Sequence, residues 1–235
     1  MSEFKGKTVV VSGALGNLGK AVAARMAQDG AKLVLLGRDR GALQSLSAAL
    51  PGSHLNYAVD LLDHETVTAA IDNVNEELST IDILLAMAGG FTMGPKVHET
   101  SAADWQKMQD MNVGTLLPLL ASVAPRMINA GQGKIVTVGA YAALKGNASM
   151  GAYAAAKSAV MRITESSAAE LKGYGINVNG VLPTVLNTPE NRAAMPNADP
   201  QNWVSPERLA DVIAFLASSE SDDMYGALLP VVGKS

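Results

Sequence analysis

The stretch Thr8–Gly19, TVVVSGALGNLG, decides how the rest of the chain is interpreted. Its first half is a run of β-branched residues, which is typical of a buried strand. Glycines follow at Gly13, Gly16 and Gly19, and a helical pattern begins after them. Glycines at such a turn let the backbone approach a pyrophosphate, whose charge is bound by free N–H groups at the helix start. The sequence therefore predicts a dinucleotide-binding loop, which also contains Leu15, Asn17 and Leu18.

Strand-like and helix-like segments alternate along the whole chain. The strand-like runs are short and mostly apolar, at 8–12, 32–36, 55–59, 81–88, 134–138, 176–182 and 227–232. Helical patterns lie between them, at 20–29, 41–50, 63–78, 101–127, 149–171 and 206–218. This alternation is typical of a parallel sheet covered on both faces. We predict a single α/β domain over residues 1–235 with a doubly wound, Rossmann-type sheet of seven parallel strands.

One long stretch has no clear pattern. Residues 187–205 are rich in Pro, Asn and Asp, and long loops of this kind in compact domains are commonly lids or disordered segments. We predict that this stretch, called the lid segment below, closes over the substrate.

Composition excludes several classes of function. The chain has 18 basic and 22 acidic side chains, a net charge of −4, and no basic run, so binding to nucleic acid or to a membrane surface is not expected. It has no cysteine and only three scattered histidines, which argues against a thiol nucleophile and against a metal site. No signal peptide or membrane-length apolar run is evident, so the protein is expected to be cytoplasmic.

The residues after the second strand bear on the choice of cofactor. An acidic residue that binds the adenosine ribose is expected about 20 residues after the glycine loop, but Gly37, Arg38 and Asp39 stand there. The guanidinium of Arg38 suits a 2′-phosphate, so NADP(H) is predicted. Asp39 reaching the ribose hydroxyls would instead favour NAD(H).

Tyr153 and Lys157 form a candidate proton-transfer pair. Their spacing places both on one face of a helix, and a fixed cation beside a phenol is expected to lower the phenol pKa toward neutrality. Tyr141 and Lys145 have the same spacing, but they follow a strand directly, so we predict that they lie in a loop at the pocket rim.

Together these features resemble the short-chain dehydrogenase/reductase family over essentially the whole chain. The resemblance implies that Tyr153 is the general acid/base, that Lys157 also binds the nicotinamide ribose, and that Asn112 supports a relay water. It also implies further cofactor contacts from segments that follow other strands, namely Asp60, Leu61, Ala88, Gly89, Pro183 and Thr188. Members of this family commonly form dimers or tetramers, so a homodimer or homotetramer is expected.

The chain departs from the family pattern at three places. The glycine spacing is atypical, and Ala86 and Met87 replace two asparagines. Ala140 occupies the position of the catalytic serine, so the substrate orients itself, or Ser149, Tyr141 or Lys145 replaces the missing donor, or catalysis is slow. Alanine at this position and the lid segment, with Met195 and Trp203, resemble dihydropteridine reductase and its bacterial look-alikes.

The sequence therefore predicts an NADP(H)-dependent oxidoreductase acting on a carbonyl or conjugated imine of a small molecule. The expected substrate contacts are Ala140, Tyr141, Ser149, Met195 and Trp203. Two alternatives stay open: a reductase of quinonoid dihydropterins, and a cofactor-binding sensor or scaffold with a weakened active site.

Overall fold

Seven strands form one parallel sheet in the order β3-β2-β1-β4-β5-β6-β7 in the computed structural model, which describes residues 3–234. This is the predicted doubly wound topology, with the strand order reversing beside β1. The strands are β1 (Thr8–Ser12), β2 (Lys32–Gly37), β3 (Leu55–Ala58), β4 (Ile83–Ala86), β5 (Gly133–Val138), β6 (Ile176–Pro183) and β7 (Leu228–Val231).

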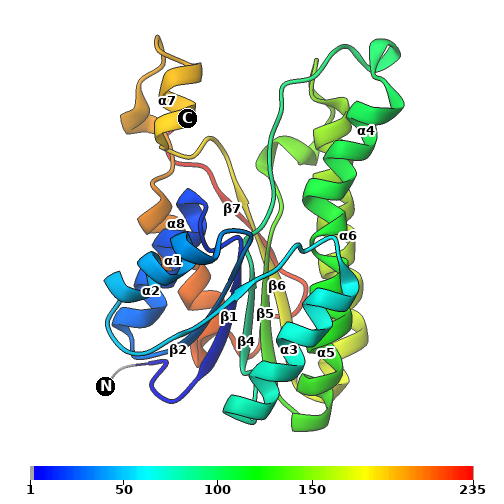
Figure 1. Cartoon of the computed structure of the whole chain (residues 1–235). Coiled ribbons are helices and arrows are strands. Elements are labelled where there is room, and N and C mark those ends of the chain that lie inside the picture. Colours follow the sequence, from blue (N-terminus) through cyan, green and yellow to red (C-terminus); the bar gives the residue numbers. More distant parts are fainter. Residues whose placement is uncertain (1–2, 235) are drawn as a thin grey trace.

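Helices cover both faces of the sheet (Figure 1). On one face lie α1 (Asn17–Gln28), α2 (Arg40–Ala49) and α8 (Pro206–Ala217). On the other lie α3 (His64–Leu78), α5 (Leu117–Ala130) and α6 (Gly151–Leu171). Side chains along a strand alternate between faces, so Val9 and Val11 join the core under α1 and α8, while Val10 joins the core under α3 and α5. This explains why the strands are almost wholly apolar.

The predicted helix at 101–127 is interrupted in the structure. It consists of α4 (Ala102–Gln109), a π-helical turn at Asp110–Gly114, and α5. In the turn the Thr115 N–H donates to Asp110 O at 3.1 Å, one residue further back than in an α-helix. The turn places Asn112 toward the site, as described below.

The helical run Ala102–Ala130 is long and apolar enough to span a membrane by length and composition, with a mean hydropathy of 1.2. The prediction that the chain has no apolar run of membrane length is therefore wrong by this criterion. Its inward residues Leu119, Val123 and Met127 are fully buried in the core beside the sheet, so in this fold the run is a covering helix.

The lid segment is more regular than predicted. It contains α7 (Pro189–Ala194) and a 3₁₀ turn at Pro200–Asn202. Thr188 caps α7 by accepting a hydrogen bond from the Asn191 N–H at 3.2 Å, and Leu186 pairs with Val204 to join the two ends of the segment. Local capping and the proline at the first helical position explain a helix that apolar periodicity did not reveal.

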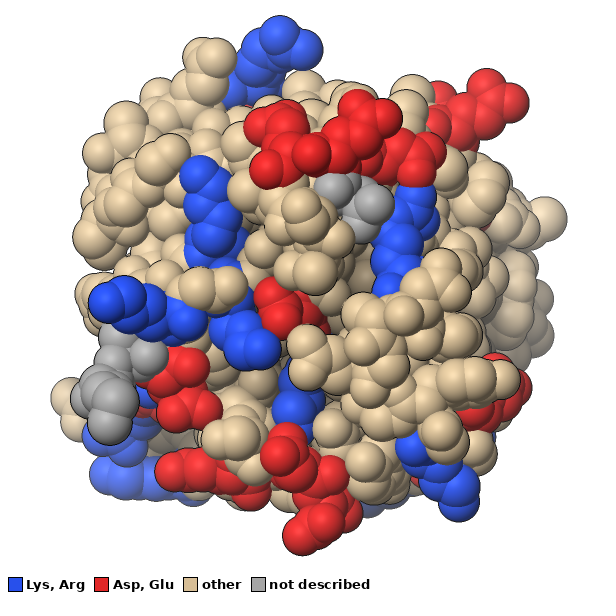
Figure 2. Space-filling model, turned by 90° about the horizontal axis from the view of Figure 1, so that it is seen from below, with Lys and Arg blue, Asp and Glu red and all other residues tan. Residues whose placement is uncertain are grey.

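Figure 2 shows the molecule from below, with acidic and basic side chains interspersed on that face. Ion pairs join the starts of neighbouring strands, such as Lys7 with Asp82 at 3.0 Å. That face therefore has charges of both signs rather than one continuous basic surface.

Candidate active site

The carboxyl ends of the parallel strands bring most of the predicted site residues to one edge of the sheet. The glycine loop follows β1, Arg38 follows β2, Asp60 follows β3, and Ala88 and Gly89 follow β4. Ala140 follows β5 and Thr188 follows β6. This edge, at the point where the strand order reverses, is where doubly wound sheets bind ligands.

The glycine loop has the geometry of an anion cradle. Gly13 has a φ of +61°, and a Cβ there would lie 2.8 Å from the backbone of Ala88. A Cβ on Gly19 would lie 2.1 Å from Gly13 O, so the first turn of α1 packs directly on the loop. This packing explains why α1 begins at Asn17, three residues earlier than predicted. The N–H groups of Asn17, Leu18 and Gly19 open the helix without an intrahelical acceptor.

Arg38 and Asp39 differ in what they contact. The Arg38 side chain is exposed and makes no hydrogen bond or ion pair with any described residue. Asp39 caps α2, because its Oδ1 accepts from the Ala42 N–H at 2.9 Å. Asp60 similarly accepts from the Leu62 N–H at 3.0 Å, beside the buried Leu61. Arg38 is therefore a cation next to the end of β2 that pairs with none of the residues the structure describes.

Tyr153 and Lys157 lie near the start of α6, where Lys157 is buried and Tyr153 is partly buried. The Lys157 Nζ donates to Val138 O at 2.8 Å, and no carboxylate of a described residue pairs with it. Burial lowers the pKa of Lys157 to about 8 and raises the pKa of Tyr153 to about 12. In the protein without cofactor the pKa of Tyr153 is raised because burial disfavours the phenolate, so the predicted lowering is not seen in this state.

Asn112 is fixed by the loop after β4. Its Oδ1 accepts from the Gly90 N–H at 3.1 Å, and its Nδ2 donates to Gly90 O and Met108 O. Gly89 lies between Asn112 and Lys157, since a Cβ on it would be 2.9 Å from Asn112 Oδ1 and 3.0 Å from Lys157 Nζ. The side chain of Asn112 therefore orients the β4 loop rather than reaching outward.

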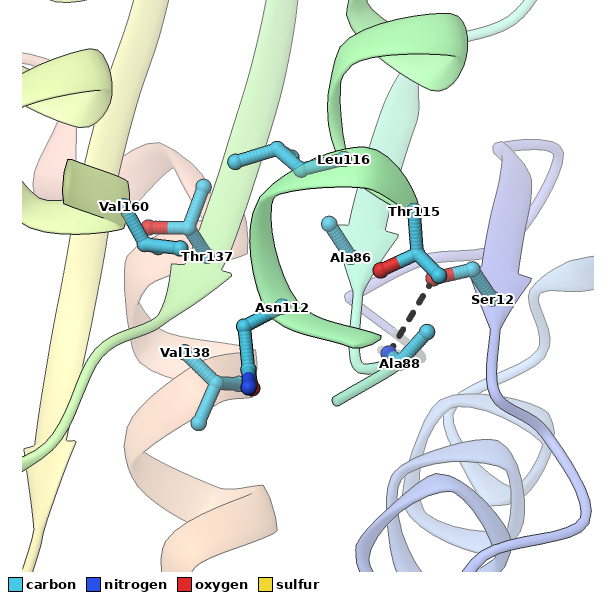
Figure 3. A pocket seen from close by; sticks show the side chains of 9 residues that line it. All are labelled: Ser12, Ala86, Ala88, Asn112, Thr115, Leu116, Thr137, Val138 and Val160. Carbon is cyan, nitrogen blue, oxygen red and sulfur yellow. Dashed lines mark hydrogen bonds between the residues drawn. The ribbon is translucent and has the colours of Figure 1, made fainter. Parts of the chain in front are cut away.

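A cavity of about 10 Å³ lies beside this arrangement (Figure 3). That is roughly the volume that one water molecule needs. It is lined by residues from β1, β4, β5, the π-helical turn and α6, including Ser12, Asn112, Thr137 and Val138. Figure 3 also shows the Ser12 hydroxyl accepting from the Ala88 N–H at 3.3 Å, which ties the glycine loop's strand to the β4 loop.

The structure separates the predicted substrate residues into two groups. Ala140 is buried and packs in a small apolar cluster against which Tyr153 also rests, and Ser149 lines a cavity together with Tyr153. Tyr141 is exposed in a 3₁₀ turn, as its predicted place at the rim requires. Met195 and Trp203 belong to the lid segment, which stands over the α1 and α8 side of the sheet in Figure 1, away from the start of α6. Pro183 ends β6, and the Thr188 hydroxyl caps α7.

Sequence analysis assigned no role to Phe91 or Glu190. The exposed ring of Phe91 meets Tyr153 edge-on, with the centroids 4.9 Å apart. The Glu190 Oε2 accepts from the Asn17 Nδ2 at 2.8 Å and so links the lid segment to the glycine loop. The position of Phe91, immediately after glycines at the end of a strand, was the available signal, whereas nothing local in sequence relates Glu190 to Asn17.

Glu190→Gln is expected to strengthen binding of a nicotinamide dinucleotide. Hydrogen bonds from its own backbone N–H, the Thr188 hydroxyl and the Asn17 amide keep the pKa of Glu190 below its usual range, so it is an anion at neutral pH beside an anion cradle. Removing this exposed charge should lower the cofactor Kd about two- to fivefold, less at high salt. Fluorescence titration of both proteins with the cofactor at two salt concentrations measures this change in Kd.

Glu207→Gln, an equally acidic position in the first turn of α8, is the control and should leave the Kd unchanged. Weaker cofactor binding by the Glu190→Gln protein would contradict the expectation.

Comparison with known proteins gives a consistent picture. Residues 7–199 match the short chain dehydrogenase family. The chain is 32% identical to meso-2,3-butanediol dehydrogenase of Serratia marcescens, over 98% of this chain and 94% of that protein. It is 29% identical to the 3-oxoacyl-[acyl-carrier-protein] reductase FabG of Vibrio cholerae, over 98% and 97% of the two chains.

Solved structures agree in fold. Carveol dehydrogenase from Mycobacterium avium in complex with NAD superposes with a TM-score of 0.91 at 27% identity, covering 99% of this chain and 98% of that one. NAD⁺-bound xylitol dehydrogenase superposes with a TM-score of 0.88 at 28% identity, covering 98% and 99%. These comparisons do not show the resemblance to dihydropteridine reductase, which stays a prediction.

Proposed function

Because this chain belongs to the short chain dehydrogenase family and is a nicotinamide-dependent oxidoreductase, we propose that it transfers hydride between NADP(H) and a carbonyl or conjugated imine of a small molecule. The observation that carries this proposal is a fully buried ammonium, Lys157, one helical turn from Tyr153 at the carboxyl edge of the sheet. Burying an unpaired charge is unfavourable for folding, so its presence points to a role in chemistry.

The residues present fit such a cofactor. Gly13 and Gly19 leave no room for side chains in the cradle, and the N–H groups that open α1 suit a pyrophosphate. Asn17, Leu18 and Leu15 would border it, while Asp60 and Leu61 would flank the adenine and Ala88 and Gly89 the ribose. Pro183 and Thr188 would meet the nicotinamide end. When bound, the cofactor supplies or accepts the hydride.

Tyr153 is proposed to give its proton to the substrate oxygen or nitrogen during reduction and to take it back during oxidation. Its raised pKa keeps the phenol protonated through the neutral range, which suits the donor role. Lys157 would bind the ribose of the cofactor, and its ammonium group would place a positive charge near the Tyr153 phenol. The cavity beside Asn112 has room for the relay water that the family resemblance implies.

The preference for NADP(H) over NAD(H) is supported by the contacts after β2. Arg38 is free to bind a 2′-phosphate, whereas one oxygen of Asp39 is committed to capping α2. We expect kcat/KM to be higher with NADPH than with NADH. Arg38→Ala should lower kcat/KM for NADPH about tenfold or more and leave the NADH value almost unchanged, since only one cofactor has the phosphate.

Arg40→Ala, which removes a neighbouring exposed cation at the start of α2, is the matched control. A wild-type protein that prefers NADH, or an Arg38→Ala protein that loses both activities equally, would reject the NADP(H) assignment.

A second candidate is reduction of quinonoid dihydropterins or similar planar conjugated imines. Ala140 has no hydrogen-bond donor for a substrate carbonyl, and a conjugated imine depends less on such a donor than a carbonyl does. The exposed ring of Phe91 beside Tyr153 also offers a surface on which a flat substrate could lie. Assays with quinonoid dihydropterin, phenanthrenequinone and meso-2,3-butanediol separate this activity from general carbonyl and alcohol chemistry. Tight cofactor binding without turnover of any of them would favour a sensor or scaffold.

Assembly, location and lid closure complete the proposal. We propose a cytoplasmic homodimer or homotetramer that associates through the helices that carry Asn112 and Tyr153, where Trp105 and Leu117 are exposed. The lid segment would close with Met195 and Trp203 over the substrate, which requires it to move from the α1 and α8 side.

A further inference from the structure

We propose that Ser149 supplies the hydrogen bond to the substrate that Ala140 cannot make, and that the cavity it lines receives the substituent beside the reacting group. This inference rests on the proposed function and identifies one further catalytic residue for it.

The position that lacks a donor, Ala140, lies two residues after β5 ends. Ala140 is buried in a cluster with Ala143, Met161 and Leu182, and Tyr153 packs against this cluster. A hydroxyl at position 140 would therefore face the region of the phenol, whereas a methyl group there provides no hydrogen bond to the substrate. A donor must come from another nearby element if the developing negative charge is to be stabilised.

Several polar side chains near Ala140 already have hydrogen-bond partners within the protein. The Thr137 hydroxyl bonds to the Thr164 hydroxyl at 2.7 Å, and the Ser158 hydroxyl donates to Ala143 O at 2.9 Å. Asn147 donates to Ala142 O at 2.9 Å. Among the described residues the Ser149 hydroxyl has no such partner, so it is available to a ligand.

The backbone of Ser149 is held in an unfavourable conformation. Its φ is +57°, and Ser79 is the only other non-glycine residue with a positive φ in the described chain. Ser149 O accepts from the Gly94 N–H at 2.9 Å, which joins the loop before α6 to the loop after β4. Glycine adopts this conformation without strain, whereas serine at this position lowers the stability of the fold. The hydroxyl group is what serine offers in return.

Ser149 and Tyr153 line the same cavity, which has a volume of about 90 Å³. This is several times the roughly 10–15 Å³ that one water needs. Met108 and Met150 give it apolar walls, and Lys107 gives it a charged side chain. Because Ser149 and Tyr153 both line it, the cavity suits a short substituent with a hydrogen-bonding group.

Two variants separate the hydroxyl from the backbone strain. Ser149→Ala removes the hydroxyl and keeps the strain, while Ser149→Gly removes both. We expect both to lower kcat about 10²-fold for whichever probe, among phenanthrenequinone, meso-2,3-butanediol and quinonoid dihydropterin, the wild-type protein turns over best. Both should leave the cofactor Kd unchanged, and Ser149→Gly should raise the melting temperature. Ala140→Ser in the Ser149→Ala background should restore part of kcat.

Ser166→Ala is the control, because Ser166 is an exposed serine further along α6 and lines neither cavity. Retention of kcat within twofold by Ser149→Ala, while Tyr153→Phe abolishes turnover, would overturn this inference and leave the proposed function intact. An equal loss from Ser166→Ala, or no rescue by Ala140→Ser, would also overturn it. Absence of wild-type turnover with every probe would overturn both.

Discussion

Replacing Tyr153 by Phe should lower kcat about 10³-fold, the range expected when a positioned general acid is removed. The substitution deletes one oxygen and leaves the ring, so the packing against Ala140 and the edge-on contact with Phe91 are preserved. Cofactor affinity and melting temperature should therefore change little. Steady-state kinetics and cofactor titration of the purified variant test this directly.

The pKa of Tyr153 adds a pH signature. Since burial raises it to about 12, the phenol stays protonated between pH 6 and 9 in the cofactor-free protein. Tyr174→Phe, which removes an exposed phenol in the 3₁₀ turn after α6, should behave as wild type. Turnover retained by Tyr153→Phe would show that another group moves the proton.

Lys157→Met should make the protein more stable at pH 7 while turnover falls to background. The pKa of Lys157 is about 8 in the folded protein, against an ordinary value of 10.5. Below pH 8 the amine is charged in both folded and unfolded states, so the cost of burying the charge is fully present, about 3 kcal/mol at 1.36 kcal/mol per pH unit. The substitution also leaves Val138 O without a hydrogen-bond donor, which lowers the unfolding free energy by about 1–2 kcal/mol. The net gain in unfolding free energy should be about 1–2 kcal/mol.

The sign of the pH dependence follows from the same pKa values. As pH rises above 8, the folded protein releases a proton from Lys157 that the unfolded chain retains, so wild-type stability should increase with pH toward 10. Lys157→Met should lack this increase. Urea unfolding at pH 7 and pH 9.5 measures both effects, with Lys172→Met, at the exposed end of the same helix, as the control. A less stable Lys157→Met protein at pH 7 would show that the buried ammonium contributes to folding.

The fold could be predicted from sequence because each of its elements has a local cause. Apolar β-branched runs such as Thr8–Ser12 indicate strands buried on both faces, and glycines such as Gly30, with a φ of +86°, end helices. The interrupted helix was not predictable in this way. Its π-helical turn depends on Asn112 binding Gly90, a contact between segments 22 residues apart.

The identity of the main site residues could be predicted from sequence, but their pKa values could not. Spacing alone placed Tyr153 and Lys157 on one face of α6, but the pKa of each depends on burial by distant segments. The edge-on contact of Phe91 with Tyr153 and the Glu190–Asn17 bond likewise join residues 62 and 173 positions apart, and no local pattern reports such distances. The lid helix was missed because capping by Thr188, rather than apolar periodicity, defines it.

The packing of α1 against α8 has a consequence for synthesis in the cell. The glycine loop and α1 are made before α8, which covers one side of α1 and begins more than 170 residues after α1 ends. β1 likewise waits for β4 to pair with it, more than 70 residues later. Such long-range pairing slows folding and exposes apolar surface meanwhile. In a nascent chain that ends before α8, the side of α1 that α8 covers is therefore exposed to solvent.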